Sequence, residues 1–102
     1  MANGLDKERS REGRLRVREI LLREWDVLGI SDFPEAHRQY DAYAAKVYVM
    51  LMDERSGEDA IAAYLYQTAT DRIGCSPGQS LAQICATAAA AVVALRPELD
   101  FH

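Results

Sequence analysis

The stretch that decides the fold of this chain reads Val47-Tyr48-Val49-Met50-Leu51-Met52. Its β-branched and aromatic residues are also typical of a buried strand. No other segment of the sequence offers a strand partner, and an unpaired strand would leave its backbone N–H and C=O groups without hydrogen bonds. We therefore expect this stretch to be helical and the chain to be all-α.

Outward from this stretch, the apolar residues of every long segment repeat with helical period. In the first segment Val17, Leu21 and Leu28 share one face, and Gly29 is a natural stop after them. The pattern predicts a single-domain antiparallel four-helix bundle. Its helices are expected over roughly residues 11–28, 33–53, 57–73 and 77–95.

The expected helix ends depend on a few local signals. Asp32, Ser56 and Ser76 are predicted to cap the last three helices. Pro97 is expected to end the fourth helix. This divides the chain into a flexible N-terminal segment over residues 1–10, a helical domain over 11–96 and a tail over 97–102.

Composition and charge narrow the classes of function. The chain has 102 residues and a net charge of -4, which suits one acidic globular domain and disfavours nucleic acid as a partner. The N-terminus is densely charged and has no apolar signal segment, and the alanine-rich run over residues 86–95 is too short to span a bilayer. A cytoplasmic location is the expectation. The two cysteines match no disulfide framework and no zinc pattern.

Chemically capable side chains gather around the single tryptophan, and we predict that they form a partner-binding surface. The set consists of Glu24, Trp25, Asp26, Glu35, Tyr40, Asp41 and Tyr43. An alternative for the aromatic members is core packing, with the indole N–H bonded to a carbonyl or carboxylate. Asp26 stands near a helix C-terminus, where the helix dipole disfavours negative charge, so a structural contact is expected to hold it.

A metal site is the second hypothesis for this region. His37 and Asp41 stand four residues apart on one helical face, and a carboxylate of the first helix could supply a third ligand. Under this hypothesis the protein would be a metal-dependent enzyme or a metal-binding protein. No third ligand is fixed by spacing and His–Asp pairs are common on helix surfaces, so neither a metal nor any other cofactor is expected in the favoured interpretation.

The apolar arcs of three helices are wider than one buried face requires. Val49, Met52, Tyr66 and Ile73 lie outside the main stripes, and we expect a homodimer or partner face built from some of them. The arginines of the first helix fall on two opposite rows, and Glu12–Arg16 and Glu19–Arg23 have the spacing of intrahelical ion pairs. A regulatory nucleic-acid binder is accordingly the least favoured hypothesis.

The tryptophan segment resembles a known group of small helical bacterial proteins of unknown function. The residues that carry the resemblance are Trp25-Asp26-Val27-Leu28-Gly29-Ile30, Pro34-Glu35-Ala36 and Tyr40-Asp41-Ala42-Tyr43. That group has Trp-Asp-Pro-Ile-Gly-Val followed by Glu-Tyr-Asp-x-Tyr, so this chain departs from it at Val27 and Gln39. The resemblance spans about residues 15–73 and implies a bacterial all-α domain, with no mechanism attached.

The favoured function is therefore a small cytoplasmic interaction protein without catalytic activity. Its acidic, aromatic surface would suit a basic partner, because complementary charge speeds and selects association. One specific version is an immunity-type protein that neutralises a basic toxin.

Overall fold

The computed structural model describes residues 4–100, and the described chain is entirely helical and turn, with no strand. Its elements are α1 (Gly4–Glu24), the 3-10 helix η1 (Pro34–Tyr40), α2 (Asp41–Met52), α3 (Glu58–Gln67), the π-helix η2 (Thr68–Ile73) and α4 (Gln79–Asp100). The predicted all-α four-helix bundle is confirmed. Residues 1–3 of the predicted N-terminal segment and residues 101–102 of the predicted tail lie outside the described residues.

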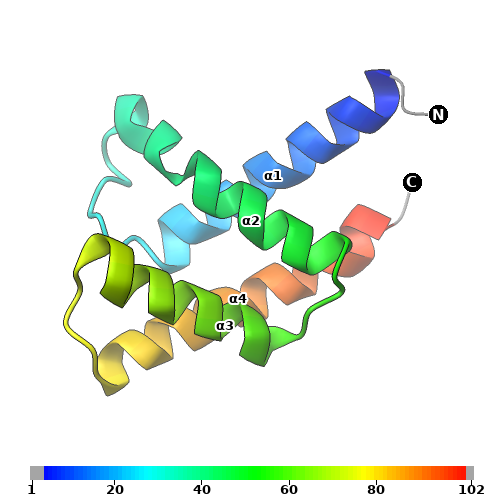
Figure 1. Ribbon diagram of the computed structural model, residues 1–102. Coiled ribbons are helices and arrows are strands. Elements are labelled where there is room, and N and C mark those ends of the chain that lie inside the picture. Colours follow the sequence, from blue (N-terminus) through cyan, green and yellow to red (C-terminus); the bar gives the residue numbers. More distant parts are fainter. Residues whose placement is uncertain (1–3, 101–102) are drawn as a thin grey trace.

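The four helices form two crossing pairs (Figure 1). Helix α1 crosses α2, α3 lies along α4, and α1 also packs against α4 to join the pairs. Consecutive helices run in opposite directions, because short loops connect neighbours in space. The first turns of α1 and the last turn of α4 consequently lie at the same end of the bundle, beside the end of α2.

One core joins all four helices and η1. Its largest fully buried side chains are Trp25, Tyr40, Leu21, Leu51, Ile61, Leu65, Val17, Val47, Val92 and Cys85. Burying one such aliphatic side chain is worth about 1.5–3 kcal/mol, so burial of one face of each helix accounts for most of the favourable free energy.

The stretch over residues 47–52 shows why the helix prevails over the strand. Val47, Met50 and Leu51 are buried, whereas Val49 remains 37% exposed. Burial at positions i, i+3 and i+4 is the pattern of one helical face, whereas a strand would bury alternate residues. The β-propensity of the stretch is overridden by the packing of that face on α1.

The predicted bounds of the first helix are wrong at both ends. Helix α1 begins at Gly4, inside the segment expected to be flexible, and ends at Glu24 instead of residue 28. It stops there because the Asp26 carboxylate takes the N–H groups of Ile30 and Ser31, which draws the chain away from the helix axis. Gly29 instead lies in a turn of the loop, where its φ is +68° and its N–H donates to the Asp26 carbonyl.

The predicted helix caps are also wrong. Asp32 makes no cap, because Phe33 occupies that position and the segment begins as a 3-10 helix. Gly57, not Ser56, precedes α3, and α4 begins at Gln79, too late for Ser76 to cap it. The predicted helical end at residue 73 is confirmed, since the π-helix η2 ends at Ile73 and the following Gly74 adopts a left-handed φ of +90°.

Pro97 does not end the fourth helix, contrary to the expectation, and the helix continues to Asp100. Proline there removes one backbone hydrogen bond, to the carbonyl of Val93. Contacts from other elements hold the last turn in place. Arg16 pairs with Glu98 at 2.7 Å, and Arg55 binds both oxygens of Asp100 at 2.8 and 3.0 Å.

Helix α4 is also long and apolar enough, by length and composition, to cross a membrane. It is the one helix of the described chain that meets this test, although the expectation from the sequence considered only residues 86–95. Core helices of globular proteins meet the same test, and α4 supplies buried residues from Leu81 to Leu95 to the core. The test therefore does not distinguish a core helix from a membrane span.

Candidate functional site

The predicted site is built around the carboxylate of Asp26, which organises the loop after α1. One oxygen, Oδ1, accepts hydrogen bonds from the Ile30 N–H at 3.0 Å and from the Tyr40 hydroxyl at 2.9 Å. The other, Oδ2, accepts the Ser31 N–H at 2.9 Å. The structural role expected for Asp26 is confirmed in this form: it satisfies loop N–H groups and does not pair with an arginine.

Tyr40 and His37 close the same loop from η1. The Tyr40 hydroxyl accepts the Leu28 N–H at 3.0 Å while it donates to Asp26. Nε2 of His37 lies 2.9 Å from the Ser31 carbonyl, a contact in which this nitrogen is the donor. Loop and 3-10 helix are thus held together as one rigid unit, which we call the Trp25 corner (residues 25–40).

The pKa values at the corner agree with these contacts. Burial raises the pKa of the Asp26 carboxyl, but the hydrogen bonds from Ile30, Ser31 and Tyr40 outweigh burial and leave that pKa below its ordinary value. Burial and the neighbouring Asp26 carboxylate raise the pKa of the Tyr40 phenol far above its ordinary value. Asp26 is therefore ionised and Tyr40 neutral at physiological pH, which fixes the direction of the bond between them.

Three aromatic rings pack beneath this loop. The ring centroids of Trp25 lie 5.7 Å from those of Tyr40 and 5.9 Å from those of Tyr43, and the two tyrosine rings are 6.2 Å apart. The indole Nε1 is buried without a conventional hydrogen-bond partner in the described structure. It lies beside Cys85, whose thiol pKa is raised by burial and lowered to a lesser extent by this indole. The predicted bond from the indole to a carbonyl or carboxylate is wrong.

Most residues predicted to contact a partner are committed to the fold instead. Trp25 and Tyr40 are 0% exposed, so their prediction as surface contacts is wrong. They are buried because two large rings fill the space between α1, α2 and α4. Tyr43 is half-buried against Trp25. The alternative of core packing is the correct one for these rings.

The predicted acidic surface is largely neutralised. The Asp26 carboxylate serves the loop, Glu24 pairs with Arg23 at 2.9 Å, and Asp41 pairs with Arg18 at 2.8 Å. Glu35 remains exposed.

The metal-site hypothesis fails on geometry. His37 is engaged with the Ser31 carbonyl and Asp41 with Arg18, so their side chains have different partners. Residues 37 and 41 also lie on different kinds of helix, because η1 ends at Tyr40 and α2 begins at Asp41. No group of three His, Cys, Asp or Glu side chains within the described range could hold a metal ion.

The residues predicted to form a dimer face do not gather into an exposed apolar patch. Val49 is 37% exposed, whereas Met52, Tyr66 and Ile73 are half-buried and pack against the core. The Tyr66 hydroxyl accepts the Gly78 N–H at 3.1 Å and so ties the loop before α4. These positions have structural contacts of their own, and the oligomeric state stays a prediction.

Two arginines of α1 pair with acids of other elements, and a third pairs with its neighbour at the end of the helix. Arg16 pairs with Glu98 of α4 instead of Glu12, and Arg23 pairs with Glu24 instead of Glu19. The predicted intrahelical pairs are wrong because acids from other elements and the helix end offer closer oxygens. Three arginines of α1 are thereby neutralised, which leaves no continuous basic face on this helix.

The most prominent surface feature of the corner is one that the sequence analysis missed. Phe33 is 56% exposed, more than any other large apolar side chain in the described chain, and Asp32 and Glu35 flank it. We call Asp32-Phe33-Pro34-Glu35 the contact loop. A signal was present, because Phe33 falls outside every helical apolar stripe and directly precedes a proline.

Comparison with known proteins found no matching family model, no matching curated protein and no matching solved structure. The resemblance of residues 15–73 to the group of small bacterial proteins therefore stays a prediction.

Proposed function

We propose that the protein is a small cytoplasmic interaction domain without catalytic activity, which binds a basic protein partner through the contact loop. The observation that carries the proposal is the exposure of Phe33 between two exposed acids on an otherwise rigid corner. Large aromatic side chains are among the most frequent energetic hot spots of protein interfaces. This proposal keeps the predicted region but moves the contact from Trp25 and Tyr40 to Phe33.

The buried part of the corner supports the loop. Asp26 holds Ile30 and Ser31, and the Phe33 N–H donates to the Ile30 carbonyl at 2.9 Å. Pro34 restricts the backbone directly after Phe33. A loop that is already ordered loses less conformational entropy on binding, so more of the contact free energy appears as affinity.

Charge favours a basic partner. Asp32 and Glu35 form no ion pair within the described residues, and residues 25–102 carry five Lys or Arg against eleven Asp or Glu. A matching partner would offer an apolar pocket for Phe33 with lysine or arginine at its rim. A basic toxin bound by an immunity-type protein is one partner of this kind.

The test is a comparative capture from lysate of the source organism, with the wild type, Phe33→Ala and Ile84→Ala as baits. Ile84 is a matched control, because it is a 41% exposed apolar residue on α4, away from the loop. We expect a basic protein that the wild type and Ile84→Ala retain and Phe33→Ala loses.

The affinity of the purified protein for this partner then gives the size of the Phe33 contribution to binding. Hot-spot aromatics cost about 2 kcal/mol or more when truncated, so Phe33→Ala should weaken binding by roughly 30-fold or more. Asp32→Asn with Glu35→Gln should slow association, mainly at low salt. Equal binding by Phe33→Ala and the wild type would refute the contact loop as the binding site.

A further inference from the structure

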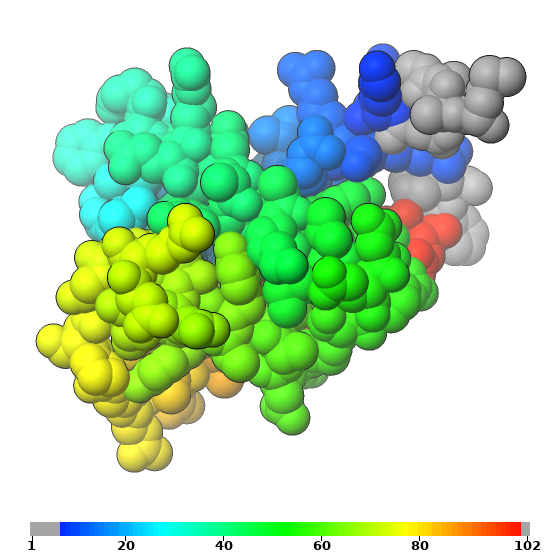
Figure 2. All heavy atoms as spheres, in the orientation of Figure 1, coloured from blue at the N-terminus to red at the C-terminus, as the bar shows by residue number. Residues whose placement is uncertain are grey.

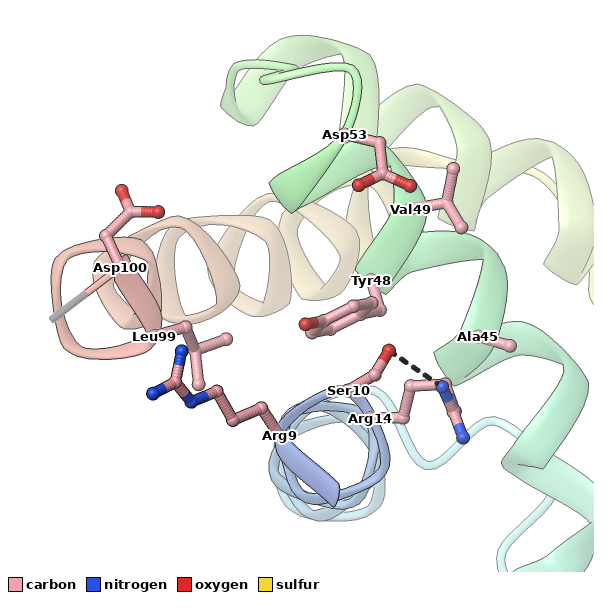
Figure 3. A pocket seen from close by; sticks show the side chains of 9 residues that line it. All are labelled: Arg9, Ser10, Arg14, Ala45, Tyr48, Val49, Asp53, Leu99 and Asp100. Atoms are coloured by element: carbon pink, nitrogen blue, oxygen red, sulfur yellow. Dashed lines mark hydrogen bonds between the residues drawn. The ribbon is translucent and has the colours of Figure 1, made fainter. Parts of the chain in front are cut away.

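A concave surface lies at the end of α1 that is remote from the contact loop. There the first turns of α1 meet α2 and the last turn of α4 (Figure 3). It is a groove of about 530 Å³, lined by Arg9, Ser10 and Arg14 of α1, Tyr48 and Val49 of α2, and Leu99 of α4. This volume lies within the range of small-molecule sites, about 300–1,000 Å³. Figure 2 shows the bundle surface from the side of α2 and α3, with the start of α1 behind α2.

Two arginines that line the groove have no ion pair among the described residues. Arg16, Arg18 and Arg23 of the same helix each pair with an acid, whereas no ion pair involves Arg9 or Arg14 in the described structure. Two unpaired cations at one concave surface are an attractive site for an anion.

Two hydroxyl groups add to this donor set. Arg14 Nη1 donates to Ser10 Oγ at 3.0 Å, which leaves the Ser10 hydroxyl hydrogen available for another acceptor. The Tyr48 hydroxyl has no hydrogen bond to any described residue, and it points toward the side of the groove where Arg9 and Leu99 lie. Figure 3 shows the guanidinium groups on opposite sides of Tyr48: Arg9 and the Tyr48 hydroxyl lie on the side of Leu99, whereas Arg14 and Ser10 lie on the side of Ala45.

The remaining walls are apolar apart from two aspartates, Asp53 and Asp100. Leu99, Val49 and the ring of Tyr48 line the groove, and Asp100 at its edge is bound by Arg55 at 2.8 and 3.0 Å. Asp53 stands at the rim beside Val49, on the far side of Tyr48 from the arginines. A ligand with its anionic group at Arg9 would therefore place an apolar body between Tyr48 and Leu99.

The geometry points to a binding site for a small anion that carries an apolar group, either a carboxylate or a phosphate monoester of an aromatic or short aliphatic body. Guanidinium groups bind both kinds of anion through charge-assisted hydrogen bonds. The rings and aliphatic side chains at the walls bury the body of the ligand. The site is separate from the contact loop and does not depend on the proposed function.

The test uses the full chain labelled with ¹⁵N, titrated with phenyl phosphate, phenylacetate, benzyl alcohol and benzylammonium at low salt. We expect one or both anions to shift the amide signals of residues 9–14, 48–49 and 99. The affinity of that anion should be at least tenfold higher than the affinity of the neutral or the cationic probe. The two anions distinguish a phosphate site from a carboxylate site. Equal affinity for benzyl alcohol, or no shift at millimolar anion, would overturn the assignment.

Charge-matched variants locate the site. Arg9→Gln should weaken anion binding about tenfold, and Arg14→Gln and Tyr48→Phe should each weaken it less. Arg11→Gln is the matched control, because it removes the same charge from the same helix at an exposed residue that does not line the groove. An equal loss with Arg11→Gln would show non-specific attraction to α1 and refute the site, and circular dichroism checks that each variant is folded.

Discussion

The Tyr40 hydroxyl donates to the Asp26 carboxylate at 2.9 Å and accepts the Leu28 N–H at 3.0 Å, so one phenol joins residues that stand 14 and 12 positions away. The ring beneath it is fully buried against Trp25. A single side chain thereby links the core to the loop that carries Phe33. The region predicted to bind a partner is in fact the support of the surface that we propose for binding.

Tyr40→Phe should destabilise the protein while it leaves the core filled. The change removes the hydrogen bond from the partly buried Leu28 N–H and one bond to a carboxylate, each worth about 1–3 kcal/mol when its partner is left unpaired. We expect a fall of about 2 kcal/mol in the free energy of unfolding, measured by urea titration with Trp25 fluorescence. Tyr43→Phe is the matched control, since the Tyr43 hydroxyl makes no hydrogen bond in the described structure. Similar losses in the two variants would show that the Tyr40 hydroxyl is not the cause.

Asp26→Asn should remove the contribution of the residue 26 carboxylate to the pH dependence of the free energy of unfolding. The folded-state pKa of Asp26 is lowered, so its contribution is complete above the ordinary value of 3.8 and is lost as pH falls through the lower, folded-state pKa. We expect the wild type to exceed Asp26→Asn by about 1–3 kcal/mol at pH 7 and the gap to narrow below about pH 4. Urea titrations at several pH values measure the gap, and a gap that stays constant down to pH 3 would contradict the assigned role.

The helical fold was predictable because its signals are periodic and repeated. The apolar stripes containing Val17 and Leu21, or Val47 and Leu51, contribute many buried side chains, and no single local preference can outweigh their sum. The helix ends were not predictable in the same way. Pro97 and Gly29 favour a stop locally, but the ion pair of Glu98 with Arg16 and the hydrogen bond of Asp26 with Tyr40 come from contacts distant in sequence.

The candidate site was predictable only as a region. Sequence identifies Trp25, Asp26 and Tyr40 as chemically capable, but it does not tell whether such side chains face the solvent or each other. That choice depends on where the chain turns after α1. The turn is held by the Asp26 hydrogen bonds to Ile30 and Ser31, and the Tyr40 hydroxyl, 14 positions later, fixes the same carboxylate to the core. Phe33 lies in the same loop and is 56% exposed.

Gly13 provides the last prediction, because it sets the distance between α1 and α2. A Cβ at this position would lie 2.4 Å from Cε1 of Tyr48, closer than any side-chain contact allows. Gly13→Ala should therefore displace the Tyr48 ring and cost about 1–3 kcal/mol of unfolding free energy, although alanine is the better helix former. Because Tyr48 lines the groove, the same change should weaken anion binding. Gly78→Ala is the control, since nothing lies within 4 Å of its added Cβ. An unchanged or raised stability of Gly13→Ala would show that the helices can separate freely at this crossing.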